Sequence, residues 1–312
     1  MACLIKRRDS DVGKTLIAKP DFTIVVFPDQ GQAVSNGTSW EALKDWVISN
    51  RVTRNILAVL SVGDITPDHA AEDWDTVLSG YNEIAATGIA CLPLIGNHDY
   101  DSISARTATS FNAHFGPSWF SGKSYYGAST YPESNNRNYY ITFDLLDKHW
   151  LIIGLEIFPP ADAIAWAVGV IEANPTKDII IVTHGYLNQD GTRTAYDDTY
   201  GPVTYWGAAP KDANGGDELW TELVKLYENI RMVICGHMIG ASPAVFVYHN
   251  DAVGDNANTV LQLFTNYQGD TNGGNGHCVL LKFRGNRLTC TPYKARATEG
   301  VDTRYPEWQW SW

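Results

Sequence analysis

Residues 89–99 read IACLPLIGNHD, an apolar run that passes directly into Gly96, Asn97, His98 and Asp99. A short apolar run that ends in a polar, glycine-bearing turn is typical of a strand buried on both faces. The residues after this run carry an amide, an imidazole and a carboxylate, which bind metal ions or transfer protons. The segment therefore predicts a strand that is buried on both faces and whose carboxyl end carries chemistry.

Four more apolar runs end in the same way. They lead, in chain order, to Asp29, Asp64, His184 and His237, after residues 23–27, 56–62, 178–183 and 231–235. Open α/β sheets place their ligand sites at the carboxyl ends of the strands. One Gly-Asp or one His after a strand is commonly a turn or a structural residue. Five such ends in series favour a metal site.

The segments between these runs have helical periodicity. Helices are expected from Thr38 or Ser39 onward and over residues 70–86, 161–173 and 217–227. Strands that alternate with helices predict a layered α/β domain. After Pro243 the pattern changes to strands without helices, at residues 244–248, 260–265, 277–283 and 287–292. These predict a second, largely antiparallel sheet.

Composition limits the classes of protein. The chain has 312 residues, 44% hydrophobic and 19% charged, which is ordinary for a globular protein. Its net charge of −12 argues against nucleic acid as a partner, because an acidic surface repels phosphate backbones. No run reaches the ~18 apolar residues that a membrane helix needs. Residues 1–10 do not read as a signal peptide, so we expect a cytoplasmic or viral protein, or a secreted one whose leader has been removed.

The five cysteines show no CxxC spacing, so they indicate neither a zinc knot nor a disulfide framework. Cys278 and Cys290 could flank a hairpin. Whether these two thiols pair is left open by the sequence.

The ordered series Asp29, Gly63-Asp64, Gly96-Asn97-His98-Asp99, His184 and Gly236-His237 resembles the signature of the calcineurin-like metallophosphoesterases. The resemblance spans about residues 21–292 and includes a softer similarity to a bacterial secreted-type branch. It implies a four-layer α/β/β/α sandwich of two mixed sheets with helices outside. We expect an N-terminal extension over residues 1–20, the metallophosphoesterase domain over 21–295 and an aromatic C-terminal tail over 296–312.

The resemblance also implies a role for each motif residue. Asp64 would bridge two metal ions. Asn97, His184 and His237 would complete one metal position, and Asp29 would belong to the other. His98 would lie outside the metal shell and either protonate the leaving oxygen or stabilise the phosphoryl group, and Asp99 would orient His98. One or two divalent ions are expected, and Mn, Fe, Zn or Mg suits these carboxylate, amide and imidazole ligands.

The chain departs from the family at one metal position. The family has Asp-x-His and Gly-His-x-His where this chain has Gly31 and Ile239 in place of the two final histidines. Three interpretations follow. Gln30 or Gln32 offers an amide oxygen to a weaker second metal, or a single metal is bound, or catalysis is lost. His69, His249 and His277 are possible substitutes, although a surface or supporting role is the simpler interpretation of each.

The predicted function is metal-dependent hydrolysis of a phosphate mono- or diester by metal-activated water. The expected substrate is a phosphorylated small molecule or a glycan-linked phosphate. The alternative is a catalytically weakened binding or structural protein of a surface or virion. Such a protein would use the aromatic segment over residues 100–138 and the aromatic tail to hold a ligand.

Overall fold

The computed structural model describes residues 21–68, 70–145, 148–208, 212–239, 247–296 and 299–312. The expected N-terminal extension over residues 1–20 and His69 lie outside these ranges. Among the described residues, no helix combines the length and the apolar character needed to cross a membrane.

The first sheet contains the three earliest strands. These are β1 (Phe22–Phe27), β2 (Ile56–Ser61) and β3 (Ala90–Leu92), which run parallel to one another. Four late strands complete the sheet: β11 (His277–Arg284), β12 (Arg287–Lys294), β13 (Gly300–Val301) and β14 (Trp308–Ser311). The strand order is β13-β12-β11-β1-β2-β3, and β14 pairs with β12. Strands far apart in the sequence thus share one mixed sheet.

The second sheet has the order β4-β5-β6-β7-β8-β10-β9. Its parallel centre consists of β6 (Lys148–Leu155), β7 (Asp178–Thr183), β8 (Ile230–Cys235) and β10 (Thr259–Thr265). Antiparallel strands flank it: β4 (Tyr126–Tyr131) and β5 (Asn138–Leu145) on one side and β9 (Val247–Val253) on the other. This sheet is therefore mixed as well.

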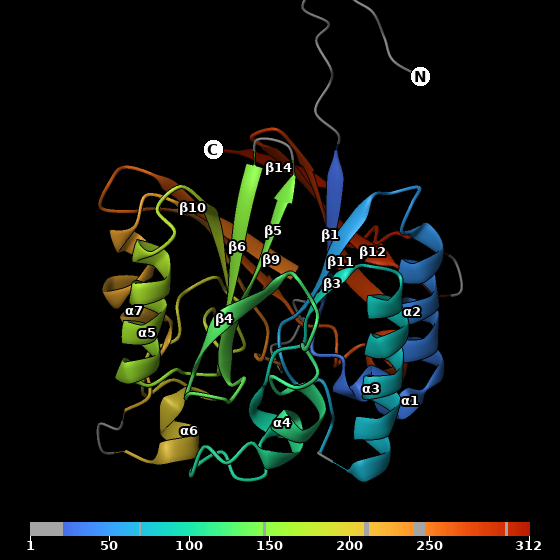
Figure 1. The fold of residues 1–312 in the computed structure, drawn as a ribbon, viewed down its shortest axis with the longest axis horizontal. Helices are drawn as coiled ribbons and strands as arrows, with labels where there is room; N and C mark the ends of the chain where they lie inside the picture. The colour runs from blue at the N-terminus through green and yellow to red at the C-terminus, as the bar shows by residue number, and fades with distance from the viewer. Residues whose placement is uncertain (1–20, 69, 146–147, 209–211, 240–246, 297–298) are drawn as a thin grey trace, which may run out of the picture.

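Helices cover the outer face of each sheet (Figure 1). α1 (Gly31–Asn36), α2 (Thr38–Asn50), α3 (Ala71–Ala86) and α4 (Thr109–Phe115) share an apolar core with the first sheet. α5 (Ala161–Glu172) and α7 (Gly216–Glu222) share another with the second sheet. A third core fills the space between the two sheets. The expected four-layer sandwich of two mixed sheets is confirmed.

The late strands are not the separate antiparallel sheet that the sequence predicted. β9 and β10 join the second sheet, whereas β11 and β12 join the first. The physical reason is visible in β11, which is apolar on both faces. Val279 and Leu281 contribute to the core between the sheets, and Leu280 contributes to the core under the helices. A strand of this kind belongs in the interior of a layered sandwich.

Two features of the C-terminal part concern the expected tail and the cysteines. β13 and β14, which follow residue 295, extend the first sheet, whereas the domain boundary at residue 295 stays a prediction. Cys278 and Cys290 are free and buried. They face different apolar cores, on opposite sides of the first sheet, which explains why they do not pair.

Candidate metal centre

The carboxyl ends of five strands converge where the two sheets meet. β1, β2 and β3 lead to Asp29, Asp64 and Asn97 from the first sheet, and β7 and β8 lead to His184 and His237 from the second. Three of these residues have positive φ: Asp29 (23°), Asp64 (48°) and His237 (74°). Strained backbone of this kind is concentrated at functional sites. The sharp turns leave these polar groups at the sheet edge, where the sequence pattern placed them.

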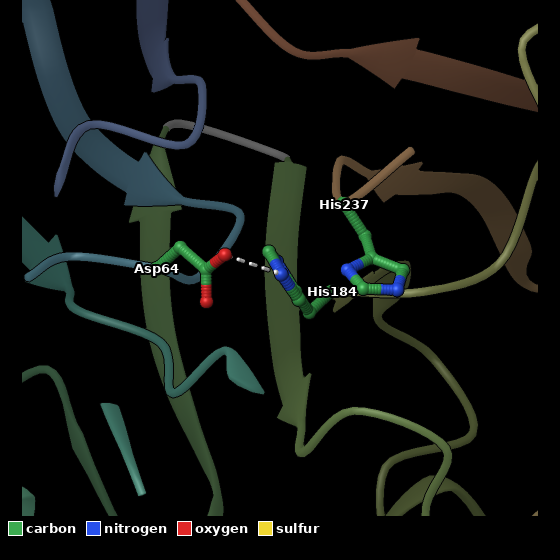
Figure 2. A group of neighbouring side chains, drawn as sticks. All are labelled: Asp64, His184 and His237. Atoms are coloured by element: carbon green, nitrogen blue, oxygen red, sulfur yellow. Dashed lines mark ion pairs between the residues drawn. The ribbon is translucent and has the colours of Figure 1, made fainter. Parts of the chain in front are cut away.

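Asp64, His184 and His237 form the tightest cluster (Figure 2). Each is buried, and one potential ligand atom from each lies within 4.8 Å of the others. His184 Nε2 lies 3.1 Å from Asp64 Oδ2 and 3.1 Å from Asn97 Oδ1. The donor set is thus two imidazoles, a carboxylate and an amide, all of which bind divalent transition metals.

Backbone carbonyls orient both imidazoles. The Val62 carbonyl lies 2.7 Å from His184 Nδ1, and the Tyr200 carbonyl lies 2.9 Å from His237 Nε2. A carbonyl only accepts, so these nitrogens carry the protons. When His184 is neutral, its Nε2 lone pair then faces the oxygens of Asp64 and Asn97. Three electron-donating atoms that face one another fit a bound cation, and the carbonyl contacts are the usual support for metal-binding histidines.

The electrostatics of Asp64 and His184 also favour a bound cation. Burial opposes the charged form of His184, but the carboxylates of Asp64 and Asp29 outweigh it and raise its pKa to about 9. Burial also opposes the charged form of Asp64, but His184 holds the pKa of that carboxyl below its usual range. Burial and the neighbouring His184 lower the pKa of His237 to about 3. The site therefore stabilises positive charge between its carboxylates, which is the charge that a metal ion carries.

Asp29 borders this cluster but has partners of its own. It is 1% exposed, and burial raises the pKa of its carboxyl. Its Oδ2 accepts from the His237 backbone N–H at 3.0 Å and from Gln268 Nε2 at 3.2 Å. Its Oδ1 has no hydrogen bond among the described residues and lies 3.3 Å from His184 Nδ1.

The two positions that lack the family's histidines differ in kind. A Cβ on Gly31 would lie 2.6 Å from the carbonyl carbon and oxygen of Thr66, so no side chain fits there. Ile239 is apolar and 43% exposed. Gln30 donates to the Tyr81 hydroxyl in α3 at 3.0 Å, so its amide nitrogen is directed to the helix. Gln32 is exposed but lines a small pocket beside the cluster, together with Asp29, Asp64, His98 and Gln268.

The histidines considered as substitutes have other contacts. His249 stacks on Trp308 with ring centroids 3.8 Å apart. His277 stacks on Tyr267 and contacts the Gly274 carbonyl and Arg304. Neither lines the pocket beside Asp29 and Asp64.

His98 and Asp99 occupy different environments. His98 is exposed at the pocket, and its backbone N–H donates to Asp64 Oδ1 at 2.9 Å. Asp99 is fully buried, and its two oxygens accept from the backbone N–H groups of Ile65, Thr66 and Gly96 and from the Thr66 hydroxyl. The expectation that Asp99 orients His98 needs correction. Its carboxylate is occupied by the loop after β2, so it positions Asp64 through the backbone.

Sequence reasoning missed three residues that contact the centre. Gln268 reaches Asp29, the carbonyl of Tyr200 holds His237, and the Tyr205 hydroxyl lies 3.3 Å from His237 Nε2. A signal existed for Gln268, because Asn266-Tyr267-Gln268 directly follows the apolar strand β10, as the other site residues follow theirs. Tyr200 acts through its backbone and Tyr205 belongs to the short helix α6 (Pro202–Trp206), so residue type gave no indication of either.

A larger hollow lies elsewhere. It is lined by Asp178, Arg231 and Asn258 among others, at the amino ends of β7 and β8. It contains none of the converging residues, so the small pocket beside Asp29 and Asp64 is the relevant one.

Known proteins resemble this chain in sequence and in structure. The uncharacterized protein YvnB of Bacillus subtilis is 27% identical over 268 residues, which cover 85% of this chain and 19% of YvnB. The chain thus spans about a fifth of that curated relative. Purple acid phosphatase PPD1 from yellow lupin (Lupinus luteus) seeds has a similar structure, with a TM-score of 0.56 and 14% identity over 94% of this chain and 54% of that one.

A dimetal phosphatase from Danio rerio matches with a TM-score of 0.55 and 12% identity, over 93% of this chain and 98% of that one. At these identities the two structures show a shared fold. The family model described as calcineurin-like phosphoesterase matches residues 22–240, more than half of the chain. That range contains all five strand ends that build the cluster. The chain belongs to the calcineurin-like phosphoesterase family.

Proposed function

We propose that this protein hydrolyses a phosphate mono- or diester with water activated by a bound divalent cation. The observation that carries the proposal is the convergence of Asp64, His184 and His237 within 4.8 Å, beside Asn97, where the two sheets meet. Membership of a phosphoesterase family supports hydrolysis of phosphate esters in general. The reaction on a specific ester is our inference.

Different residues of the chain have different roles in this reaction. A divalent cation supplies a water of lowered pKa and binds the phosphoryl oxygens when it is present. The carbonyls of Val62 and Tyr200 hold the two imidazoles with one nitrogen of each turned to the cluster. His98 lies exposed on the pocket and donates a proton to the leaving oxygen. Ligands without a thiolate suit Mn, Fe, Zn or Mg.

We further propose a small phosphorylated molecule or a glycan-linked phosphate as substrate. The pocket beside Asp29, Asp64 and His98 is small, which suits a phosphoryl group with the rest of the substrate outside. The net charge of −12 disfavours a long nucleic acid.

The rival function is a binding or structural protein without catalysis. It needs accessible aromatic side chains in the segment over residues 100–138 and in the C-terminal tail. Phe120 is 1% exposed and Trp310 is 8% exposed, and both belong to the core between the sheets. Trp308 is stacked on His249. These aromatic side chains contribute to the fold, which favours the enzyme.

The test uses 4-nitrophenyl phosphate and bis(4-nitrophenyl) phosphate with protein stripped of metal by a chelator. We expect hydrolysis to return when Mn²⁺, Zn²⁺, Fe²⁺ or Mg²⁺ is restored. His98→Ala should lower kcat by roughly 10²- to 10⁴-fold, the usual contribution of a general acid. His149→Ala is the matched control, because His149 is exposed and pairs with Asp144 on the second sheet. Equal rates for wild type, His98→Ala and Asn97→Ala would exclude the proposed role of this site.

A further inference from the structure

The centre has two unequal sides. On one side Asp64, Asn97, His184 and His237 offer a carboxylate, an amide and two imidazoles. On the other side, Asp29 is the one carboxylate apart from the shared Asp64 that the described residues place in the lining of the pocket. Gly31 has no room for a side chain, and Ile239 has no ligand atom. The described residues therefore fit one cation well and a second one poorly.

Gln268 is the side chain that faces Asp29 on this poorer side. It lines the pocket and donates from Nε2 to Asp29 Oδ2 at 3.2 Å. The same oxygen accepts the His237 backbone N–H at 3.0 Å, so Asp29 Oδ2 has two donors. The amide nitrogen of Gln268, rather than its oxygen, thus lies against Asp29.

The turn after β10 holds Gln268 in place. Its backbone N–H donates to Asn266 Oδ1 at 2.9 Å, and Asn266 Nδ2 in turn donates to the Met238 carbonyl at 3.4 Å. Met238 follows the ligand His237 directly, and β10 runs parallel to β8. The Gln268 loop and the His237 loop are thus fixed to each other, so the amide contact belongs to the fold of the centre.

We propose that this centre holds a single divalent cation, and that the carboxamide of Gln268 takes the place of a second cation beside Asp29. A carboxamide nitrogen has two N–H groups, and Asp29 accepts from one of them. The other N–H donates to a phosphoryl oxygen of the substrate in the pocket. The part of the inference that concerns the substrate rests on the proposed function, whereas the number of cations does not.

The first experiment counts metal ions. Chelator-stripped protein is saturated with Mn²⁺, separated from free ion by gel filtration and measured by elemental analysis. We expect one ion per chain in the wild type and none in His184→Ala. Gln268→Glu should bind a second ion, because a carboxylate beside Asp29 supplies the missing ligand. Gln309→Glu in β14 is the control for added charge and should still bind one ion, since Gln309 is exposed.

The outcomes separate the two proposals. Two ions in the wild type, with hydrolysis still dependent on metal, would overturn the single-cation inference and leave the proposed function standing. One ion in the wild type without any hydrolysis would support the inference and overturn the proposed function. If the Gln268→Glu variant still binds only one ion, Gln268 does not occupy the position of a second cation beside Asp29.

The second experiment probes the phosphoryl contact with inorganic phosphate. The Kd of phosphate is measured by calorimetry on Mn²⁺-loaded wild type, Gln268→Ala and the exposed control Gln309→Ala. Loss of a hydrogen bond to a charged group should weaken phosphate binding by roughly tenfold or more in Gln268→Ala alone. An unchanged Kd, with circular dichroism showing a folded variant, would overturn this contact.

Discussion

Gly63 illustrates how the backbone of single residues shapes the centre. Its φ is 103°, and an added Cβ would lie 2.6 Å from His184 Nδ1, against the ring that the cluster depends on. We expect Gly63→Ala to weaken Mn²⁺ binding by roughly 10- to 100-fold, the usual effect of disturbing the support of a metal ligand. Isothermal titration of stripped protein measures the change.

Gly122 provides the matched control for that substitution. It also has positive φ, 77°, but an added Cβ would meet no atom within 4 Å. Gly122→Ala therefore carries a similar backbone strain without the contact to His184. Equal losses of affinity in the two variants would mean that strain, rather than the ring of His184, is responsible.

His277 makes the stability of the protein depend on pH. Burial lowers its pKa below the ordinary value of 6.5, and the positive charge of Arg304 lowers it further. The Gly274 carbonyl and the carboxylates of Asp302 and Asp270 raise the pKa but do not outweigh the burial. Arg304 donates to Nε2 at 3.1 Å, which also requires a neutral ring. As the pH falls below about 6.5, the unfolded state takes up the proton first, so stability present at neutral pH is lost.

The variant His277→Gln isolates this contribution. Urea unfolding at pH 7.5 and pH 5 should show a smaller loss of unfolding free energy for His277→Gln than for the wild type. Other buried histidines contribute the same pH dependence of the unfolding free energy to both proteins. An identical loss in the two would show that His277 does not cause the dependence.

At the level of residues, chemistry could be predicted where side-chain type and position act together. Asp29, Asp64, Asn97, His184 and His237 each follow an apolar strand, and the parallel strands bring them to one place. Asp99 was assigned to the wrong partner, because sequence adjacency to His98 does not reveal that its carboxylate faces the loop of Thr66. Gln268 was missed because an amide after a strand is common.

The last strand, β14, joins the first sheet through aromatic side chains. Trp310 is 8% exposed and lies in the core between the sheets, with the Trp312 ring centroid 5.2 Å away. Trp310→Ala should lower the unfolding free energy by about 3 kcal/mol, because it leaves a cavity in a packed core. Urea denaturation measures this loss. The neighbour Gln309 is exposed, and its alanine variant should stay within ~0.5 kcal/mol of the wild type.

At the level of elements, local periodicity was sufficient for most strands and helices but not for their partners. The strand predicted over residues 178–183 matches β7, and the helix predicted over 161–173 matches α5 nearly to the residue. The pairing of β11 with β1 could not be predicted, because it joins residues that lie more than 250 positions apart, such as Phe22 and Phe283. Pairing of this kind is decided by burial on both faces, which emerges only in the assembled sandwich.

For the whole molecule, the metal centre connects the two sheets. Asp64 and Asn97 belong to the first sheet, and His184 and His237 belong to the second. A cation that all four residues bind stabilises the folded state and not the unfolded state. The stabilisation is about 2.7 kcal/mol when the cation is present at 100 times its Kd. Mn²⁺ should therefore raise the Tm of stripped wild-type protein, and a chelator should reverse the rise. His184→Ala should show no rise, and a Tm independent of Mn²⁺ in the wild type would contradict a cation held between the sheets.

The position of β1 between β2 and β11 has a consequence for synthesis of the chain. β1 leaves the ribosome well before its partner β11, which begins only at His277. At 5–20 residues per second, the interval is on the order of tens of seconds. Throughout it, one side of an apolar strand has no neighbour, and such an edge invites pairing with other chains. The nascent protein therefore depends on protection from aggregation until β11 has been synthesised.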